Sequence, residues 1–306
     1  MRRVIIIGSG RMAPGIAASC AAGGLDVVVA ARDPARAELA ARAATKLAGA
    51  PVAAAPIEPA SFAKADLAIE TIVEELEAKT EVLERVDGWL PERAMLTTNT
   101  SSLSINSLAE GLSRPDRFAG LHFLYPADLT RLVEIVPSRA TAADVLEALE
   151  QLAPRMGKQP IRLRSDIPGF LWNRLQFAML RECLHLIDAG VADVAAIDAV
   201  VSDGLAPRWL AAGPLATADL GGLDTFRRVA QQLFPEIASE TRVSDALTRR
   251  ADDGNGFYRW TESRREQIEQ LRADLLATVS VTSERRRSAM PATNELLDGG
   301  TLERRE

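Results

Sequence analysis

Apolar and polar residues alternate along the first half of the chain in a way that predicts strands separated by helices. Short apolar runs rich in β-branched or small residues occur at 4–7, 27–30, 52–55, 67–71 and 94–97. Alanine-rich stretches of helical character lie between several of these runs. This alternation is typical of a doubly wound parallel sheet. We therefore predict an α/β fold with an N-terminal Rossmann domain.

The second half of the chain has a different pattern, in which long helical runs replace the strand signals. One predicted helix covers 173–189, with Gly190 as its C-cap, and another begins at 195. We predict an all-helical C-terminal domain. The boundary falls at the extended segment that ends in Pro168 and Gly169, which gives domains at 1–166 and 167–306.

Length and charge narrow the class of protein. A chain of 306 residues is long enough for about two domains. The net charge is −6 and the arginines are interspersed with acidic residues, which argues against a nucleic-acid partner. The apolar runs are shorter than the roughly 18 residues of a membrane span, and Cys20 and Cys183 lack metal-ligand spacing. We expect a cytoplasmic protein with reduced thiols, no membrane segment and no metal site.

A glycine-rich turn follows the first predicted strand, in the run Gly8-Ser9-Gly10-Arg11-Met12-Ala13. The first glycine permits the tight turn, the second lets the backbone approach a pyrophosphate, and the small Ala13 allows close helix-sheet packing. The N-terminus of the following helix offers N–H groups and partial positive charge to phosphates. This turn predicts a dinucleotide site formed by Gly8, Gly10, Arg11, Met12 and Ala13.

The end of the second strand bears on the choice of nicotinamide cofactor. An NAD enzyme normally carries an acidic residue there for the ribose 2′-hydroxyl, and Ala31 stands at that place. The next residue, Arg32, suits a 2′-phosphate, and Arg36 offers a second contact. We favour NADP(H) over NAD(H). In the alternative, Asp33 accepts the ribose hydroxyl, although it also precedes Pro34 as a helix N-cap.

Further motifs along the chain are Asn99-Thr100-Ser101-Ser102, His122-Phe123 with Pro126, Glu134, Pro168-Gly169-Phe170 with Asn173-Arg174, Asp219-Leu220-Gly221-Gly222, and Gly254-Asn255-Gly256-Phe257-Tyr258. Together with the glycine turn, they resemble the 3-hydroxyacyl-CoA dehydrogenase family over nearly the whole chain. The family includes 3-hydroxybutyryl-CoA dehydrogenases, and Arg208-Trp209 resembles its free-acid branch of lambda-crystallin and L-gulonate 3-dehydrogenase. Arg208 and Trp209 could form a site for a substrate carboxylate, or they could serve the packing of the domain.

The resemblance implies roles for individual residues. His122 would be the general base toward the substrate hydroxyl and Glu134 its orienting partner, while Ser101 and Asn173 would hold the substrate oxygen. Glu74 and Lys79 match family contacts near the nicotinamide ribose, and Asn99 is a further cofactor candidate. A homodimer formed through the helical domain is also implied.

The chemistry agrees with these residue types. Hydride removal from a CH–OH group requires a base for the hydroxyl proton, and a positioned histidine contributes about 10² to 10⁴-fold. A carboxylate partner fixes its tautomer. Simpler alternatives are a buried structural histidine at 122, a helix cap at Ser101 and an ordinary helix residue at Asn173. His185 has no partner motif, and we interpret it as structural.

Two departures from the family affect the substrate. Tyr125 stands where the family generally has Asn, and the segment between Asp33 and Asp66 has no room for the helical arm that helps to hold CoA. We therefore predict interconversion of a 3-hydroxyacyl-type substrate, either a thioester or a short free acid, with its 3-keto form, in the cleft between the domains. The rival is a non-catalytic NADP(H)-binding sensor or crystallin-like protein, which would not need His122, Glu134, Ser101 and Asn173 together.

Overall fold

The structure is a computed structural model that describes residues 1–253 and 256–289. The chain divides into two compact units, Met1–Gln176 and Phe177–Glu306, which we describe separately. The division falls inside helix α7 (Trp172–Asp188), ten residues after the position expected from the sequence. Residues 254 and 255 of the late glycine motif lie outside the described residues.

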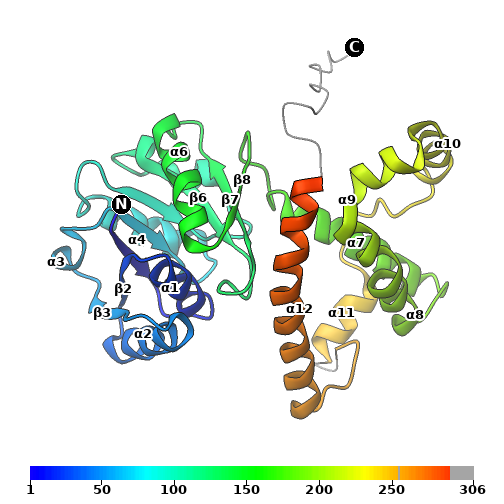
Figure 1. The fold of residues 1–306 in the computed structure, drawn as a ribbon, viewed down its shortest axis with the longest axis horizontal. Helices are drawn as coiled ribbons and strands as arrows, with labels where there is room; N and C mark the ends of the chain where they lie inside the picture. The colour runs from blue at the N-terminus through cyan, green and yellow to red at the C-terminus, as the bar shows by residue number, and fades with distance from the viewer. Residues whose placement is uncertain (254–255, 290–306) are drawn as a thin grey trace. The chain divides into compact units, whose positions relative to one another are not determined.

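The first unit is built on one eight-stranded sheet with the strand order β3-β2-β1-β4-β5-β6-β7-β8 (Figure 1). The strands are β1 (Arg3–Ile7), β2 (Asp26–Ala31), β3 (Ala53–Pro56), β4 (Leu67–Glu70), β5 (Met95–Thr98), β6 (Phe118–Phe123), β7 (Leu132–Pro137) and β8 (Gln159–Arg162). The first six are parallel, whereas β7 runs antiparallel to β6. The Rossmann prediction is confirmed, and the added strands make the sheet mixed.

Helices cover both faces of this sheet. They are α1 (Ala13–Ala22), α2 (Pro34–Ala48), α3 (Pro59–Phe62), α4 (Leu76–Asp87), α5 (Ile105–Ala109) and α6 (Ala143–Leu152), with 3₁₀ turns at Pro115–Arg117 and Ala153–Met156. Alternate residues of a strand point to opposite faces. Val4 and Ile6 therefore pack in the core beneath α1, α2 and α6, while Ile5 and Ile7 pack in the core beneath α4 and α5.

The second unit is helical, as predicted. It contains the rest of α7, then α8 (Val194–Ala199), a π-helical segment (Val200–Leu205), α9 (Ala206–Gly221), α10 (Leu223–Leu233), α11 (Asp245–Asp252) and α12 (Glu262–Ala289). Helix α9 is kinked where Gly213 has φ 73° before Pro214. Helix α7 ends at Asp188, and Gly190 follows it with φ 68°. Among the described residues, no helix combines the length and the apolar character that a membrane crossing requires.

Candidate active site

The glycine turn lies between β1 and α1 and has the shape of a phosphate cradle. Gly8 has φ 121°, and a Cβ atom there would lie 2.6 Å from the carbonyl oxygen of Thr71, so this position requires glycine. A Cβ on Gly10 would meet no atom within 4 Å, which leaves that side of the turn open. No side chain caps the N-terminus of α1; the N–H of Ala13 donates to the carbonyl of Gly10 and Pro14 has no N–H, so the positive end of the helix dipole is what this terminus offers to an anion. The residues fit a dinucleotide pyrophosphate.

The end of β2 is as the sequence indicated. Ala31 is buried, and the Arg32 side chain that follows it is exposed. Asp33 is the N-cap of α2, because its Oδ1 accepts hydrogen bonds from the N–H groups of Ala35 at 2.9 Å and Arg36 at 3.4 Å. Between β2 and β3 the chain forms a single helix, α2, and no helical hairpin.

His122 and Glu134 are directly opposite each other on the antiparallel strands β6 and β7. Side chains of opposed residues emerge on the same face of a sheet and meet. His122 Nδ1 lies 2.8 Å from Glu134 Oε2, and both side chains are buried. An ionised carboxylate only accepts hydrogen bonds, so Nδ1 carries a proton toward it and Nε2 is left as the acceptor. This arrangement presents His122 Nε2 as a base.

The second oxygen of Glu134 binds the start of α7. Its Oε1 accepts hydrogen bonds from the N–H groups of Leu171 and Trp172, each at 2.9 Å. The preceding turn has Gly169 at φ 77° and Phe170 at φ 52°, a left-handed conformation that is uncommon for a non-glycine residue. The buried ring of Phe170 meets the His122 ring edge-on, with 5.5 Å between their centroids. The turn thus holds both members of the pair in place.

Ser101 and Asn173 also gather at this histidine, although not in the same way. Ser101 Oγ lies 3.1 Å from His122 Nε2, and with the ring proton on Nδ1 the hydroxyl is the donor in this pair. Asn173 Nδ2 donates to the main-chain carbonyl of Ser101 at 2.9 Å. The structure therefore places the Ser101 hydroxyl at His122 Nε2, whereas Asn173 contacts the main chain of Ser101.

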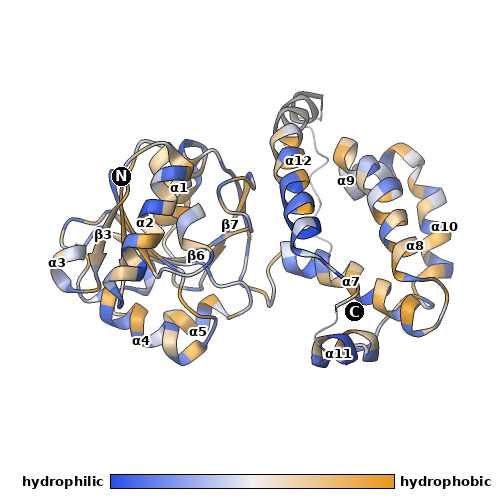
Figure 2. Cartoon of the chain, turned by 90° about the horizontal axis from the view of Figure 1, so that it is seen from below, coloured by the Kyte–Doolittle hydropathy of each residue, from blue (hydrophilic) through white to orange (hydrophobic). Residues whose placement is uncertain are grey.

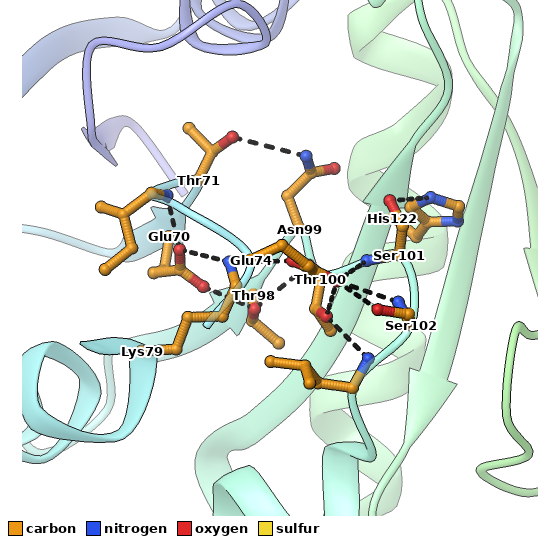
Figure 3. A network of polar contacts seen from close by, with 12 residues as sticks. Glu70, Thr71, Glu74, Lys79, Thr98, Asn99, Thr100, Ser101, Ser102 and His122 are labelled. Carbon is orange, nitrogen blue, oxygen red and sulfur yellow. Dashed lines mark hydrogen bonds and ion pairs between the residues drawn. The ribbon is translucent and has the colours of Figure 1, made fainter. Parts of the chain in front are cut away.

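A buried ion pair, shown in Figure 3, supports the loop that carries Ser101. Lys79 Nζ donates to Glu70 Oε1 at 2.7 Å, and both side chains are almost completely buried. Glu70 also accepts from Thr98 Oγ1 at 2.6 Å and from the N–H of Ile72 at 2.6 Å. Sequence reasoning missed Glu70, although a carboxylate at the end of the apolar strand β4 was a detectable signal of a buried partner.

Glu74 uses its carboxylate on the same loop. Its Oε1 accepts from Thr100 Oγ1 at 2.6 Å and from the N–H groups of Ser101 at 2.8 Å and Ser102 at 3.0 Å (Figure 3). Partial burial raises the pKa of Glu74, but the Thr100 hydroxyl, the nearby Lys79 ammonium and the loop donors together lower it below its usual value. Glu74 is therefore ionised at neutral pH.

Asn99 connects the ends of three strands. Its Oδ1 accepts from the N–H of Phe123 at 2.7 Å, and its Nδ2 lies 3.4 Å from Thr71 Oγ1. The side chain is buried, so Asn99 holds together the carboxyl ends of β4, β5 and β6, next to His122. Figure 3 shows Asn99 between Thr71 and the Ser101 loop.

Two cationic side chains contact the loop after β6: Arg11, which the sequence predicts at the cofactor turn, and Lys158, to which the sequence analysis assigns no role. The guanidinium of Arg11 stacks on the ring of Tyr125, 3.9 Å from its centroid, which connects the glycine turn to the loop after β6. Lys158 is buried, and its ammonium donates to the carbonyl oxygens of Ala127 and Thr130 in that same loop. The loop after the histidine strand is thus held by two cations.

The second unit holds the other sequence candidates. His185 Nδ1 lies 2.9 Å from Glu240 Oε1, a partner that the sequence pattern did not indicate. Arg208 is exposed and Trp209 is half-buried. No group of three or more histidine, cysteine or acidic side chains within residues 1–253 and 256–289 could hold a metal ion. Cys20 is buried in α1, Cys183 is only half-buried in α7, and both are free thiols.

Most of the chain matches two domain models of one protein family. Residues 54–167 match the model described as 3-hydroxyacyl-CoA dehydrogenase, NAD binding domain, and residues 169–260 match the C-terminal domain of the same family. Residues 3–76 match the model described as NADP oxidoreductase coenzyme F420-dependent.

Whole-chain comparisons agree with these matches. The 3-hydroxybutyryl-CoA dehydrogenase of Bradyrhizobium diazoefficiens is 33% identical to this chain, and the matched region covers 84% of this chain and 95% of the relative. The 5-formyl-3-hydroxy-2-methylpyridine 4-carboxylate 5-dehydrogenase of Mesorhizobium japonicum is 29% identical over 91% of this chain and 97% of its own.

Solved structures show the same two kinds of relative. A crystal structure of the latter activity, described as an NAD⁺-dependent dismutase, superposes with a TM-score of 0.85 at 27% identity and covers 95% of this chain and all of its own. The (S)-3-hydroxybutyryl-CoA dehydrogenase of Ralstonia eutropha superposes with a TM-score of 0.70 at 30% identity and covers 86% of this chain and all of its own.

Proposed function

The chain belongs to the 3-hydroxyacyl-CoA dehydrogenase family, and we propose that it interconverts a small 3-hydroxyacyl-type substrate and its 3-keto form with His122 as the general acid/base. As a member of this family it is an oxidoreductase that acts on CH–OH groups and binds a pyridine nucleotide. The observation that carries the proposal is the chain of contacts from Ser101 through His122 to Glu134.

In the proposed mechanism each residue has one task. His122 Nε2 takes the proton of the substrate hydroxyl, and Glu134 stabilises the imidazolium that forms. Ser101 holds the substrate oxygen at that nitrogen. When bound, the nicotinamide supplies the acceptor for the hydride that leaves the substrate carbon. In the reverse direction His122 returns the proton to the keto oxygen.

The proposed cofactor contacts follow from the glycine turn. Gly8, Gly10, Met12 and Ala13 form the pyrophosphate cradle, and Arg11, held against Tyr125, faces the same anion. We propose that Glu74, Lys79 and Asn99 support the nicotinamide end. The buried contacts of Lys79 with Glu70 and of Asn99 with the N–H of Phe123 support an indirect role, in which the two residues hold the loops at the ends of β4, β5 and β6 in place.

We propose that NADP(H) is preferred over NAD(H). Arg32 is exposed directly after β2, where its guanidinium suits a 2′-phosphate, and Asp33 Oδ1 is engaged in capping α2, so that this oxygen is not free to accept a ribose 2′-hydroxyl. A charged hydrogen bond contributes about 1.5 to 3 kcal/mol, so Arg32→Ala should raise the KM for NADPH about 10- to 100-fold and leave that for NADH nearly unchanged. Equal losses with both cofactors would contradict the preference.

The substrate is proposed to be a free acid or another compact molecule in preference to a CoA thioester. The chain lacks a helical hairpin between β2 and β3, where acyl-CoA enzymes of the family carry an arm. The relative that matches over the larger share of both chains acts on a pyridine carboxylate. That similarity also favours a second candidate, oxidation of a hydrated aldehyde to its acid through the same His122, coupled to reduction of a second aldehyde.

The decisive experiment compares two histidines that each contact a carboxylate. His122→Asn should lower kcat by several orders of magnitude for NADPH-dependent reduction of acetoacetate or acetoacetyl-CoA, and cofactor binding followed by fluorescence should persist. His185→Asn, at the His185–Glu240 pair, should leave kcat unchanged. If His122→Asn retained full activity with its preferred substrate, the proposed mechanism would be wrong. Cofactor binding without turnover of any keto acid, thioester or aldehyde by the wild type would instead favour a non-catalytic binding protein.

We also propose that the second unit forms a homodimer. Among its described residues only Leu184, Ile197, Ala238 and Ala246 are buried, so the unit has little core of its own. Helix α10 exposes Leu223, Phe226, Val229 and Leu233, and Figure 2 shows apolar residues along α8 and α10. Apolar surface of this extent marks an interaction site. Light scattering should give twice the chain mass of 33.0 kDa, and a monomer at micromolar concentration would contradict the proposal.

A further inference from the structure

We propose that Glu74 is a positioning residue that acts through Ser101, and that its carboxylate fixes the Ser101 hydroxyl at His122 instead of serving chiefly as a cofactor contact. The inference rests on the proposed function, because Ser101 matters only if His122 is the base. It gives Glu74 a task different from the one that family resemblance implies.

The contacts of one oxygen atom carry the argument. Glu74 Oε1 accepts from four donors, which are Thr100 Oγ1 at 2.6 Å, the N–H groups of Ser101 at 2.8 Å and Ser102 at 3.0 Å, and Ser102 Oγ at 3.0 Å. Successive N–H groups that converge on one anion form the backbone concavity known as a nest. This oxygen therefore organises the whole turn after β5, and the turn carries Ser101.

Ser101 is held from two sides by these contacts. Its N–H donates to Glu74 and its carbonyl accepts from Asn173 Nδ2 at 2.9 Å. With both main-chain groups engaged, the Cα–Cβ direction is fixed and the hydroxyl lies 3.1 Å from His122 Nε2. Removal of Glu74 would release one of the two anchors without touching the histidine pair.

The buried pair behind Glu74 keeps this carboxylate in place and charged. Lys79 Nζ lies 3.4 Å from Glu74 Oε2 and 2.7 Å from Glu70 Oε1, and its side chain is 1% exposed. The buried Lys79 ammonium lies between two carboxylates, so it is not free to bind a ligand, and it attracts the carboxylate of Glu74. The Glu70–Lys79 pair thus supports the loop through Glu74.

The exposure of Glu74 makes the proposal testable. Its side chain is 38% exposed, so truncation leaves no large cavity and the donors that lose the carboxylate can meet water. The cost should therefore appear in the placement of Ser101 more than in folding. A misplacement of about 1 Å at a reacting group can reduce the rate about 10²-fold.

The experiment is a double-mutant cycle in the full-length chain with Glu74→Ala and Ser101→Ala, each assayed on the substrate that the wild type turns over best. Glu74→Ala should lower kcat about 10- to 100-fold and change the Kd for NADPH less than threefold. Ser101→Ala should lower kcat at least as much. The double variant should equal Ser101→Ala alone, because the anchor has no effect once the hydroxyl is absent.

Two further variants separate positioning from folding and from charge. Glu74→Gln keeps an oxygen for the loop donors, so it should recover a large part of kcat, and its thermal unfolding should match that of Glu74→Ala within a few degrees. Glu75→Gln changes the neighbouring carboxylate, for which α4 shows no side-chain cap bond, and should behave as the wild type in every assay. If Glu74→Ala does not fold, Glu74→Asp, which withdraws the carboxylate from the loop donors by one methylene group, replaces it in the same cycle with Ser101→Ala.

Several results would overturn the inference. One is that the losses in kcat of the two single variants multiply in the double variant. Another is that Glu74→Ala raises the Kd for NADPH tenfold or more and leaves kcat unchanged. A third is that Glu74→Ala keeps the wild-type kcat and Kd. Failure of the proposed function looks different, because His122→Asn and Ser101→Ala would then both retain wild-type kcat. Inactive His122→Asn together with fully active Glu74→Ala would refute only the positioning role.

Discussion

Lys158 is a buried cation whose titration should be visible in the stability of the protein. Its side chain is 5% exposed, and its ammonium donates to main-chain carbonyl oxygens of Ala127, Thr130 and, at 3.5 Å, Asp128. Burial lowers the pKa of Lys158 from 10.5 to about 8, although the Asp128 carboxylate and the Cys20 thiol oppose this change. The folded state therefore binds the proton less tightly than the unfolded chain does.

The sign and the size of the effect follow from linkage. Below pH 8 the lysine is charged in both states and the full penalty of burying the charge is present. Between pH 8 and 10.5 the unfolded chain keeps its proton while the folded state has released it, so the free energy of unfolding rises with pH. A pKa difference of this size corresponds to about 3 kcal/mol, since one pH unit is about 1.4 kcal/mol.

The assay is urea unfolding followed by circular dichroism, at pH 7 and pH 10, for the wild type and Lys158→Met. Methionine has a similar length and no charge, so it removes the titration. The difference in free energy of unfolding, wild type minus variant, should grow by about 2 to 3 kcal/mol over this interval in favour of the wild type. The exposed Lys64, replaced in the same way as a control, should give a difference that does not change with pH.

A difference between wild type and Lys158→Met that is constant from pH 7 to pH 10 would refute the reasoning. It would mean that water reaches the ammonium, or that Asp128 compensates for the burial completely. A difference that moves in the opposite direction would show that the loop stabilises the charged form, and the three carbonyl contacts would then outweigh desolvation.

Three other substitutions have definite expected outcomes. Glu134→Gln should lower kcat about 10²- to 10⁴-fold with little change in cofactor Kd, because an amide can donate to His122 and reverse its tautomer; unchanged kcat in steady-state assays would contradict this. Gly8→Ala should abolish cofactor binding and lower the unfolding temperature by several degrees, since its Cβ would lie 2.6 Å from a carbonyl oxygen. Tyr125→Ala should raise the KM for cofactor several-fold and Tyr125→Phe should not, because the ring alone supports the stacked guanidinium; equal effects would exclude stacking as the cause.

Local patterns were sufficient to predict the first part of the fold. The strand, glycine turn and helix from β1 to α1 are encoded within twenty residues, and the turn requires glycine at position 8. The pairing of His122 with Glu134 was expected from the family resemblance, and the antiparallel strands β6 and β7 place the two residues in register.

Contacts between distant segments were not predictable in the same way. The sequence showed neither that Glu134 also binds the N–H groups of Leu171 and Trp172 nor that Lys158 binds the loop after β6. Main-chain carbonyl and amide partners leave no trace in residue identity, since every residue except proline offers both groups. The hydrogen bond from Asn173 to the main-chain carbonyl of Ser101 was unpredictable for the same reason, because the family pattern does not show which main-chain group a side chain contacts.

The two hydrogen bonds that Glu134 Oε1 accepts determine which substitutions the start of α7 can tolerate. The two donors that hold Oε1 are main-chain amides, and the side chains of Leu171 and Trp172 are 43% and 41% exposed. Substitution of either side chain leaves the amides where they are. Substitutions at these two positions can therefore change the surface at the start of α7 while the amides that hold Glu134 stay in place, so this surface and the histidine pair can evolve independently.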